Sequence, residues 1–275
     1  MSSRVLDTLL PLLRHEPARR RVRATLAGEI VVDSTEAVLV WEPQRALPTY
    51  AVPREHVRGE LLPAPPTTAP AGPLGFLHPN GQTVLDPSVP FSGVHTAEGE
   101  PLSLRAAGET RHGVGFRPAD PDLEGLVLLD SAGLDAWFEE DDPVLGHARD
   151  PFSRLDILPS SRTVRIALDG VLVAESARPQ LVFESPILPV RAYLPPEDIR
   201  VPLKPSGTRS HCPRKGEAAY WSLDLNGRIV HDVAWSYENP RREAAPLAGL
   251  ICFFDERVDA SLDGESSPRP HTPWA

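Results

Sequence analysis

A chain of 275 residues is long for one domain and sufficient for two, each able to bury a core of its own. Its 28 Lys and Arg residues stand against 38 Asp and Glu residues, so the net charge is −10. That charge argues against nucleic acid and anionic membrane surfaces as partners, and no stretch approaches the roughly 20 apolar residues of a membrane span. Two cysteines are too few for a disulfide scaffold, so we expect a reduced, cytoplasmic protein.

The first predicted element is a short N-terminal helix within an arm of residues 1–19. Residues 3–14 have the spacing of an amphipathic helix, with one side formed by Val5, Leu9, Leu10 and Leu13. Beyond the arm, 32 prolines favour short strands joined by Pro-marked loops, because helix interiors tolerate proline poorly.

An internal repeat organises the rest of the chain. Residues 22–58 align with residues 164–200 at a constant offset of 142 and without gaps. Residues 123–136 then align with residues 247–260 at an offset of 124, so the first copy is 18 residues longer between the two blocks. In the first block 12 of the 37 positions are identical, namely Val22, Arg23, Leu26, Gly28, Val31, Ser34, Leu39, Val40, Glu42, Pro53, Glu55 and Arg58.

Each copy is predicted to be one small antiparallel β domain. The expected boundaries are residues 20–150 for a first, degenerate domain, 155–263 for the second domain and 264–275 for a flexible tail. In the second copy, alternating strands flank Asp169-Gly170 and Asn226-Gly227, two-residue sequences that favour hairpins. The predicted fold class is mainly β, with two homologous antiparallel meanders that form an open barrel or a folded sheet. Residues 59–112 of the first copy have the composition of a long irregular segment.

The Asn226-Gly227 turn predicts the register of its hairpin. Pairing from this turn runs Leu225–Arg228, Asp224–Ile229, Leu223–Val230, Ser222–His231, Trp221–Asp232 and Tyr220–Val233. One face then carries Tyr220, Ser222 and His231, with Trp235 beside them. Such a group can line a small-molecule pocket, and the competing interpretation is an ordinary core with satisfied polar tips.

Six short segments of the second copy occur in a distinctive order: 174–176 (AES), 183–184 (FE), 193–198 (YLPPED), 210–216 (SHCPRKG), 218–221 (AAYW) and 235–240 (WSYENP). With these segments the second copy resembles a bacterial and fungal family, the domain of unknown function numbered 427. The resemblance covers nearly all of the second copy and about half of the first. It departs from the family pattern at Ser210, where Thr is expected, and at Arg214, where an aromatic residue is usual.

The resemblance implies no settled activity, although the family has been labelled nucleotidyltransferase-like. This sequence lacks the Gly-Ser helix start and the strand-borne Asp-x-Asp pair of such enzymes. Asp120-Pro121-Asp122 has the spacing, but Pro121 makes it a poor strand and we expect a turn. The acidic residues of the run 137–143 (WFEEDDP) are likewise expected in a solvated turn.

The predicted loop 208–216 concentrates reactive and cationic groups in an acidic protein. Its cations favour the thiolate of Cys212 and a negatively charged ligand. The functional interpretation is an anion- or carbonyl-binding site with Cys212 as nucleophile or Lys215 as anchor, and with His211 and Arg214 as ligand contacts. The alternative is a structural Cys-Pro turn with solvated charges, because perturbed groups also occur in structural networks.

Glu184 ends an apolar strand and is a candidate general base. Glu42 occupies the same position in the first copy, which lacks Cys212, so a structural hydrogen-bonding role is an equal alternative. Tyr193 and Tyr237 are further candidate ligand contacts. The spacing that would make His211, Cys212 or His231 metal ligands is absent, and we predict neither a metal nor a cofactor.

Two functional hypotheses follow for the second domain. The first is a small-molecule-binding protein or enzyme whose site gathers the Cys212 hairpin, Glu184 and the aromatic residues. The second is a non-catalytic accessory or interaction module in which the shared motifs only build the fold. The sequence does not indicate an oligomeric state.

Overall fold

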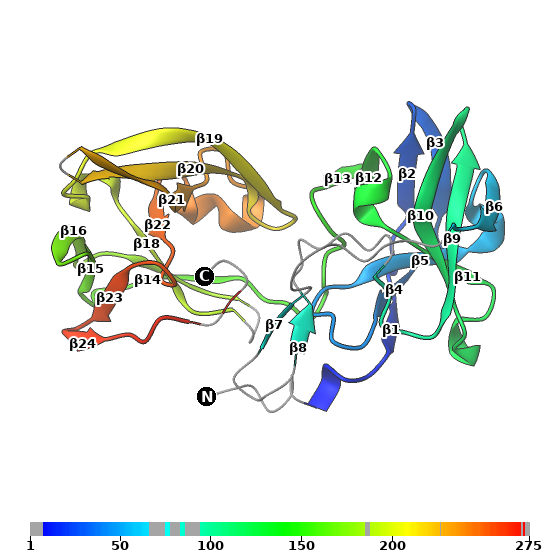
Figure 1. The fold of residues 1–275 in the computed structure, drawn as a ribbon, viewed down its shortest axis with the longest axis horizontal. Helices are drawn as coiled ribbons and strands as arrows, with labels where there is room; N and C mark the ends of the chain where they lie inside the picture. Colours follow the sequence, from blue (N-terminus) through cyan, green and yellow to red (C-terminus); the bar gives the residue numbers. More distant parts are fainter. Residues whose placement is uncertain are drawn as a thin grey trace. The chain divides into compact units, whose positions relative to one another are not determined.

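A computed structural model describes residues 8–65, 75–77, 83–85, 94–184, 188–225, 227–270 and 272. The chain forms two compact units, residues 1–150 and residues 151–275 (Figure 1). Each unit contains a seven-stranded and a four-stranded antiparallel sheet, which confirms a mainly β fold with two homologous domains. Within the described residues neither unit closes into a barrel, so the folded sheet is the form observed. The same residues include no helix long and apolar enough to cross a membrane.

The first unit is built on a seven-stranded sheet with the order β1-β4-β5-β11-β10-β9-β6. Those strands are β1 (Arg14–Pro17), β4 (Val38–Trp41), β5 (Thr49–Pro53), β11 (Leu126–Leu129), β10 (Glu109–Pro118), β9 (Gly99–Ala106) and β6 (Glu60–Pro63). Its second sheet runs β13 (Asp142–Val144), β12 (Ala136–Glu139), β2 (Val22–Leu26) and β3 (Glu29–Ser34). A separate pair joins β7 (Gly75–Leu77) to β8 (Thr83–Leu85), and 3-10 turns occur at η1 (Arg54–His56), η2 (Pro121–Leu123) and η3 (Ser131–Gly133).

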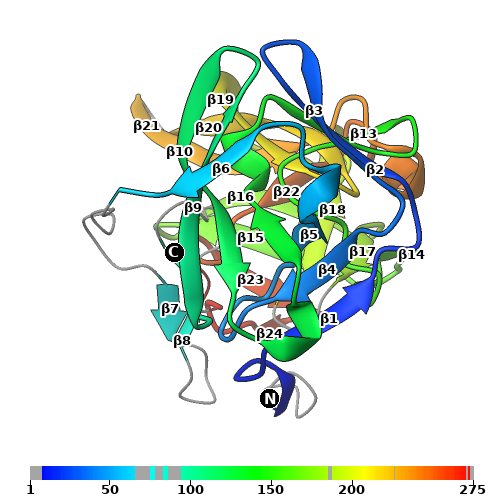
Figure 2. The ribbon, with the colours of Figure 1, turned by 90° about the vertical axis from the view of Figure 1, so that its right-hand side faces the viewer.

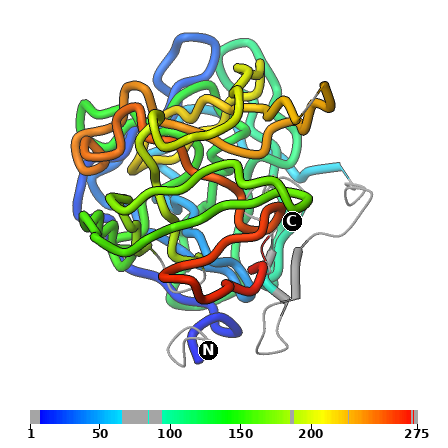
Figure 3. Tube along the Cα trace, turned by 90° about the vertical axis from the view of Figure 1, so that its left-hand side faces the viewer, coloured from blue at the N-terminus to red at the C-terminus, as the bar shows by residue number. Residues whose placement is uncertain are grey.

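The second unit repeats this order as β14-β17-β18-β22-β21-β20-β19. Those strands are β14 (Asp156–Pro159), β17 (Gln180–Phe183), β18 (Arg191–Leu194), β22 (Ile251–Phe253), β21 (Arg228–Ser236), β20 (Gly216–Leu225) and β19 (Leu203–Cys212). Its second sheet runs β16 (Val171–Ser176), β15 (Val164–Leu168), β23 (Asp259–Leu262) and β24 (Glu265–Ser266). Figure 3 shows β15 in green beside β23 in red. The 3-10 turns are η4 (Pro196–Asp198) and η5 (Arg242–Leu247).

Backbone details confirm the duplication at the level of single residues. Ala27 and Gly28 turn with φ of 48° and 79°, and Asp169 and Gly170 turn with φ of 51° and 77°. Only residues that tolerate the left-handed region fit such a turn easily, which explains the shared glycine. The isolated bridges Val32–Val57 and Ala174–Ile199 also correspond at the offset of 142.

The duplication extends through the segment in which the two sequences look unlike. The first unit has its own long hairpin, β9–β10, which turns at Ala107 and Gly108 (Figure 2). Ala106 and Leu225 precede the two turns, so positions here correspond at an offset of 119. The expectation of an irregular segment over residues 59–112 was wrong where β6, β9 and the start of β10 lie, because Ala107 takes the left-handed φ of 50° without an Asn-Gly signal. Asn226 itself lies outside the described residues.

The predicted register of the second hairpin is correct near the turn and wrong beyond it. Leu225, Asp224 and Leu223 pair as predicted. A bulge then places residues 231–233 opposite Ser222, so Tyr220 pairs with Trp235 rather than with Val233. Asp232 takes a φ of 50° in this bulge, and its N–H donates to Ser222 Oγ over 3.2 Å.

The same bulge is built into the first unit. Residues 112–114 lie opposite Ser103, whose Oγ accepts the N–H of Gly113 over 3.4 Å. Gly113 corresponds to Asp232 and has a φ of 66°. The two serines therefore hold equivalent bulges, and Ser222 has a structural partner rather than a place on an open pocket face.

Each seven-stranded sheet is buried on both faces. In the second unit, alternate residues of β18 and β22 point to opposite sides, as a pleated strand requires. Leu194, Ile251 and Phe253 pack with both sheets into the core between them. Tyr193 and Cys252 pack on the other face with Trp235, Tyr237 and the turn η5. We call this second set, together with Val182, Ala218, Ala244, Leu247 and Phe254, the outer cluster.

The chain ends differ from their predicted forms. Of the expected helix over residues 3–14, Thr8 and Leu9 are helical, residues 1–7 lie outside the described residues, and Arg14 already begins β1. In the predicted flexible tail, β24 pairs with β23, and the buried Thr272 donates to Glu256 over 2.5 Å.

Candidate functional site

The predicted loop 208–216 is mostly strand. β19 continues to Cys212, which pairs with Gly216 at the start of β20, and residues 213–215 form the turn between them. Gly216 has a φ of 105°, a value that favours glycine. The carbonyl of Lys215 accepts the N–H of Arg241 over 3.0 Å, which holds the turn against the segment that follows β21. This hairpin points Lys215 toward the end of β17.

Lys215 meets Glu184 in a nearly buried ion pair. Nζ lies 2.5 Å from Oε2 of Glu184, and the two side chains are 10% and 13% exposed. Burial by itself would lower the pKa of Lys215, but the charges of Glu184 and Cys212 outweigh it and raise that pKa. Lys215 therefore remains an ammonium at neutral pH, which makes it a donor and a charge rather than a nucleophile.

Two buried tyrosines lie beside the pair. Tyr193 is fully buried, and its hydroxyl accepts the indole N–H of Trp235 over 2.9 Å. The ring of Tyr237 lies 6.5 Å from that of Tyr193. Burial, followed by the charges of Cys212 and Glu184, raises the pKa of Tyr237, so both tyrosines are neutral. No described residue accepts or donates a hydrogen bond at the Tyr237 hydroxyl.

The cations expected around Cys212 each have a carboxylate partner. Arg214 pairs with Glu243 at 2.8 Å, and His211 lies 3.2 Å from Glu217. Both histidines proposed as ligand contacts, His211 and His231, are exposed, and neither has a contact with the Lys215–Glu184 pair. The structure therefore brings together Cys212, Lys215, Glu184, Tyr193, Tyr237 and Trp235, and it leaves His211, His231 and Arg214 outside that group.

Tyr220 belongs to the edge of the outer cluster. Its hydroxyl donates to Ser210 Oγ over 2.9 Å, and its ring lies 6.0 Å from that of Phe254. Phe254 in turn packs at 4.4 Å from Trp235. Tyr220 thus supports Trp235 from the side of the Cys212 hairpin.

No pattern in the sequence pointed to Arg191, a buried cation in contact with Trp235 of the outer cluster. Its guanidinium binds Glu256 at 2.6 and 3.0 Å, lies 3.2 Å from Asp255 and stacks 5.5 Å from the Trp235 ring. Burial raises the pKa of Asp255 to about 6 despite the guanidinium. The first copy has Thr49 at the position of Arg191, so this charge is specific to the second unit.

The first unit shows what the same fold does without Lys215. Glu42, the counterpart of Glu184, is completely buried. It accepts the N–H groups of Thr96 and Ala97, each over 3.1 Å, and lies 3.2 Å from Nδ1 of His95. The buried guanidinium of Arg45 is also near it, with Nε 3.6 Å from Oε2 of Glu42. At the offset of 119, Thr96 corresponds to Lys215.

The outer face of the first unit is also less polar. Its cluster contains Val40, Ala51, Phe116, Leu123 and Leu128. At the established offsets Ala51 replaces Tyr193, Leu128 replaces Cys252, and Phe116 replaces Trp235. At these described positions the first unit therefore lacks the phenol of Tyr193, the thiol of Cys252 and the ammonium of Lys215.

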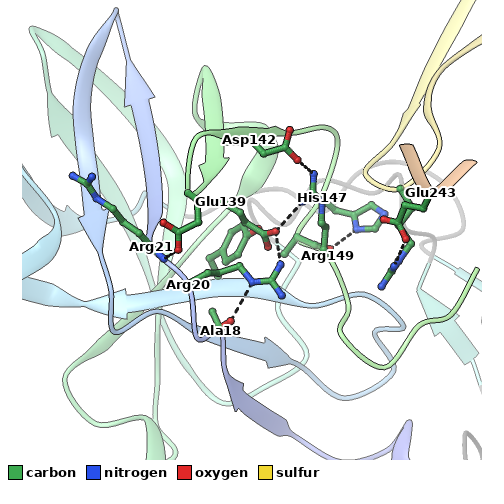
Figure 4. A network of polar contacts seen from close by, with 12 residues as sticks. Ala18, Arg20, Arg21, Glu139, Asp142, His147, Arg149 and Glu243 are labelled. Carbon is green, nitrogen blue, oxygen red and sulfur yellow. Dashed lines mark hydrogen bonds and ion pairs between the residues drawn. The ribbon is translucent and has the colours of Figure 1, made fainter. Parts of the chain in front are cut away.

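The first unit has a further buried carboxylate, Glu139, in its second sheet. Arg20 and Arg149 converge on the buried carboxylate of Glu139 at 2.6 and 3.3 Å (Figure 4). Tyr50 donates to the same carboxylate over 2.8 Å. The acidic run 137–143 is therefore not solvated throughout. Because every contact of Glu139 is to a permanent protein partner, this network holds strands together and offers no open position.

The Asp120–Asp122 segment and the candidate metal ligands can also be compared with the structure. Asp120 is the N-cap of η2 and accepts the N–H of Asp122, which confirms the turn predicted there. Within the described residues, no three His, Cys, Asp or Glu side chains are grouped to hold a metal ion.

Comparisons with known proteins agree with this architecture. The leucyl/phenylalanyl-tRNA–protein transferase of Bordetella petrii is 30% identical over 185 residues. The match covers 66% of this chain and 58% of that protein, so the chain spans less than two thirds of its relative. The model of the domain of unknown function DUF427 matches residues 14–71 and 156–264, one segment in each unit. The chain is therefore a tandem member of the DUF427 family.

Proposed function

We propose that the second unit binds a small molecule at the Lys215–Glu184 pair, with Tyr237 and Cys212 beside it. The first unit would then be a copy that keeps the fold without the site. The observation that carries the proposal is the contrast between Glu184 and Glu42. The same fold holds its strand-end glutamate with backbone N–H groups, His95 and the guanidinium of Arg45 in one unit, and with a single ammonium in the other.

The energetics of the pair support a role beyond folding. Removing two charges from water costs several kcal/mol per ion, and their attraction repays that cost only when the geometry and the remaining hydrogen bonds are good. Lys215 gives one hydrogen bond to a described residue, although an ammonium has three donors. The first unit shows that the fold does not require this ammonium. A residue that the fold does not need, and whose donors are unused, fits ligand binding.

The roles first assigned to the site residues change in this proposal. Lys215 binds as a charged donor, because its raised pKa keeps it protonated. Glu184 positions that ammonium and is occupied by it, so the general-base role is not proposed. Cys212 lies at the end of β19 with intermediate exposure and remains the candidate nucleophile.

The name of the Bordetella petrii relative describes a transferase that acts with an aminoacyl-tRNA. We do not extend that activity to this chain, because the chain spans 58% of that protein and its net charge of −10 disfavours an RNA partner. The nucleotidyltransferase-like label receives no support either, since Asp120 and Asp122 lie in a turn.

A thermal-shift screen of a metabolite library tests the proposal on three proteins. They are the wild type, the site variant Lys215→Met/Glu184→Gln, and the control variant Arg178→Met/Glu197→Gln. The control removes an exposed ion pair of the same unit, at 2.8 Å. We expect compounds that raise the Tm of the wild type and the control but not of the site variant. If every stabilising compound acts equally on the site variant, the pair only builds the fold, as in the accessory-module hypothesis.

A further inference from the structure

We propose that the group bound at the Lys215–Glu184 pair is an uncharged amide, or a group like it that places a carbonyl oxygen beside a polar hydrogen. This inference rests on the proposed function and specifies the ligand class. Of the two ligand classes that the sequence of the hairpin suggested, an anion or a carbonyl group, it selects the carbonyl group.

The net charge of the site argues against a charged ligand. Lys215 and Glu184 sum to zero, and the neighbouring tyrosines are neutral because burial raises their pKa values. Arg214 and His211 are matched by carboxylates of their own. A buried anion would therefore meet no net positive charge, and burying an unpaired charge is strongly unfavourable.

The donors and acceptors that the site leaves unused indicate which uncharged group fits it. Within the described residues, two N–H groups of Lys215 and the hydroxyl of Tyr237 have no partner, which leaves donors that need an acceptor oxygen. Glu184 binds Lys215 through Oε2, and no described group donates to its Oε1, which leaves an acceptor that needs a donor. An amide satisfies both needs in one planar group, because its carbonyl accepts while its N–H donates.

Cys212 provides a reporter beside the pair. Its thiol is partly exposed, three residues before Lys215, and it acts electrostatically on both Lys215 and Tyr237. Iodoacetamide and iodoacetate alkylate a thiol in the same way: sulfur displaces iodide and the thiol proton goes to solvent. The two reagents differ only in carrying an amide or a carboxylate. Their rate ratio at Cys212 therefore measures which of these groups the pair prefers.

The experiment measures both alkylation rates on the intact chain by mass spectrometry of the Cys212 peptide. Glutathione gives the intrinsic ratio of the two reagents, and the exposed-pair variant Arg178→Met/Glu197→Gln is the protein control. In the wild type and the control we expect the preference for iodoacetamide to exceed that of glutathione by about tenfold, as one or two hydrogen bonds would produce. In Lys215→Met/Glu184→Gln the ratio should return to the glutathione value.

A single substitution provides an independent check. Glu184→Gln leaves the ammonium without its carboxylate, so the preference should reverse toward iodoacetate. Circular dichroism establishes whether each variant is folded. If Glu184→Gln is not folded, the double variant Lys215→Met/Glu184→Gln still tests the inference.

Two results would overturn the inference. A wild-type ratio equal to that of glutathione would show that the pair recognises neither group. A wild-type preference for iodoacetate would show that the site takes an anion, which leaves the proposed binding function intact. A library screen without site-dependent hits contradicts the proposed function separately, because the alkylation ratio needs no natural ligand.

Discussion

Glu42 and Glu184 occupy the same position in the two units, yet Glu42 is held by backbone N–H groups and the guanidinium of Arg45, and Glu184 by the ammonium of Lys215. We therefore expect substitution of Glu42 and substitution of Glu184 to change the free energy of unfolding by different amounts. It also provides an internal comparison in which the fold is constant and the partner changes.

The Lys215–Glu184 pair should respond differently to single and double substitution. Lys215→Met leaves a buried carboxylate unpaired, and we expect a loss of about 3 to 5 kcal/mol in the free energy of unfolding of the second unit. Lys215→Met/Glu184→Gln removes both charges and should cost much less than the single variant. Urea denaturation followed by circular dichroism measures both. A double variant as unstable as the single one would show that the loss does not come from an unpaired charge.

Tyr193 and Tyr237 form a matched pair for the hydrogen bonds of the outer cluster. Tyr193→Phe removes the acceptor of the buried Trp235 N–H and should cost about 1 to 3 kcal/mol. Tyr237→Phe removes a hydroxyl without a described partner and should cost less than about 0.5 kcal/mol. Thermal unfolding and tryptophan emission compare the two variants. Equal costs would contradict the assigned hydrogen bonds.

The contribution of Asp255 to the stability of the second unit should fall as the pH rises from about 4 to about 6. Burial raises the pKa of Asp255 from 3.8 to about 6, so the folded protein holds this proton while the unfolded chain releases it. Stability contributed by a raised carboxyl pKa is present at low pH and is lost as the pH rises through that window. The shift of roughly two units corresponds to up to about 3 kcal/mol. Glu256 acts in the opposite direction, because its pKa is lowered.

Asp255→Asn tests this pH dependence because it removes the titration. Hydrogen exchange of the amides in β18 and β22, measured between pH 4.5 and pH 7, reports the local stability. After correction for intrinsic exchange, the variant should lose less protection with rising pH than the wild type. An unchanged profile would assign the titration to another group.

Ala107 occupies a turn that suits other residues better. Its φ of 50° lies in the left-handed region, which costs an alanine about 1 kcal/mol relative to asparagine or glycine. Ala107→Asn should therefore raise the free energy of unfolding of the first unit by up to about 1 kcal/mol. Val171→Lys is a control, because Val171 is exposed and does not have a left-handed φ. A destabilised Ala107→Asn variant would contradict the turn geometry.

Local signals in the sequence predicted most of the fold. Alternating residues around Asp169-Gly170 specify a hairpin because the turn is complete within four residues. The repeat identified the second copy of each strand from β2 to β5, since both copies must place apolar residues toward equivalent cores. Where the signal was absent, as at Ala107, the prediction missed a hairpin that the tertiary structure imposes on an ordinary sequence.

The bulge at residues 231–233 shows a second limit. A bulge changes the register by inserting residues that have no fixed composition, and Asp232 adopts its left-handed φ where the first unit has Gly113. The pairing of Tyr220 with Trp235 therefore could not be read from the turn alone. His231 was placed on the pocket face for the same reason, and the bulge leaves it exposed.

The sequence by itself determined the duplication, the β class, and the restriction of the reactive side chains to the second copy, because these depend on residue identity and short-range pattern. Only the tertiary structure decided which charges meet. Lys215 reaches Glu184 across 31 residues, while Arg214 and His211 turn to other carboxylates. Such pairings depend on the positions of strand ends that are distant in the chain, and a linear pattern does not contain them.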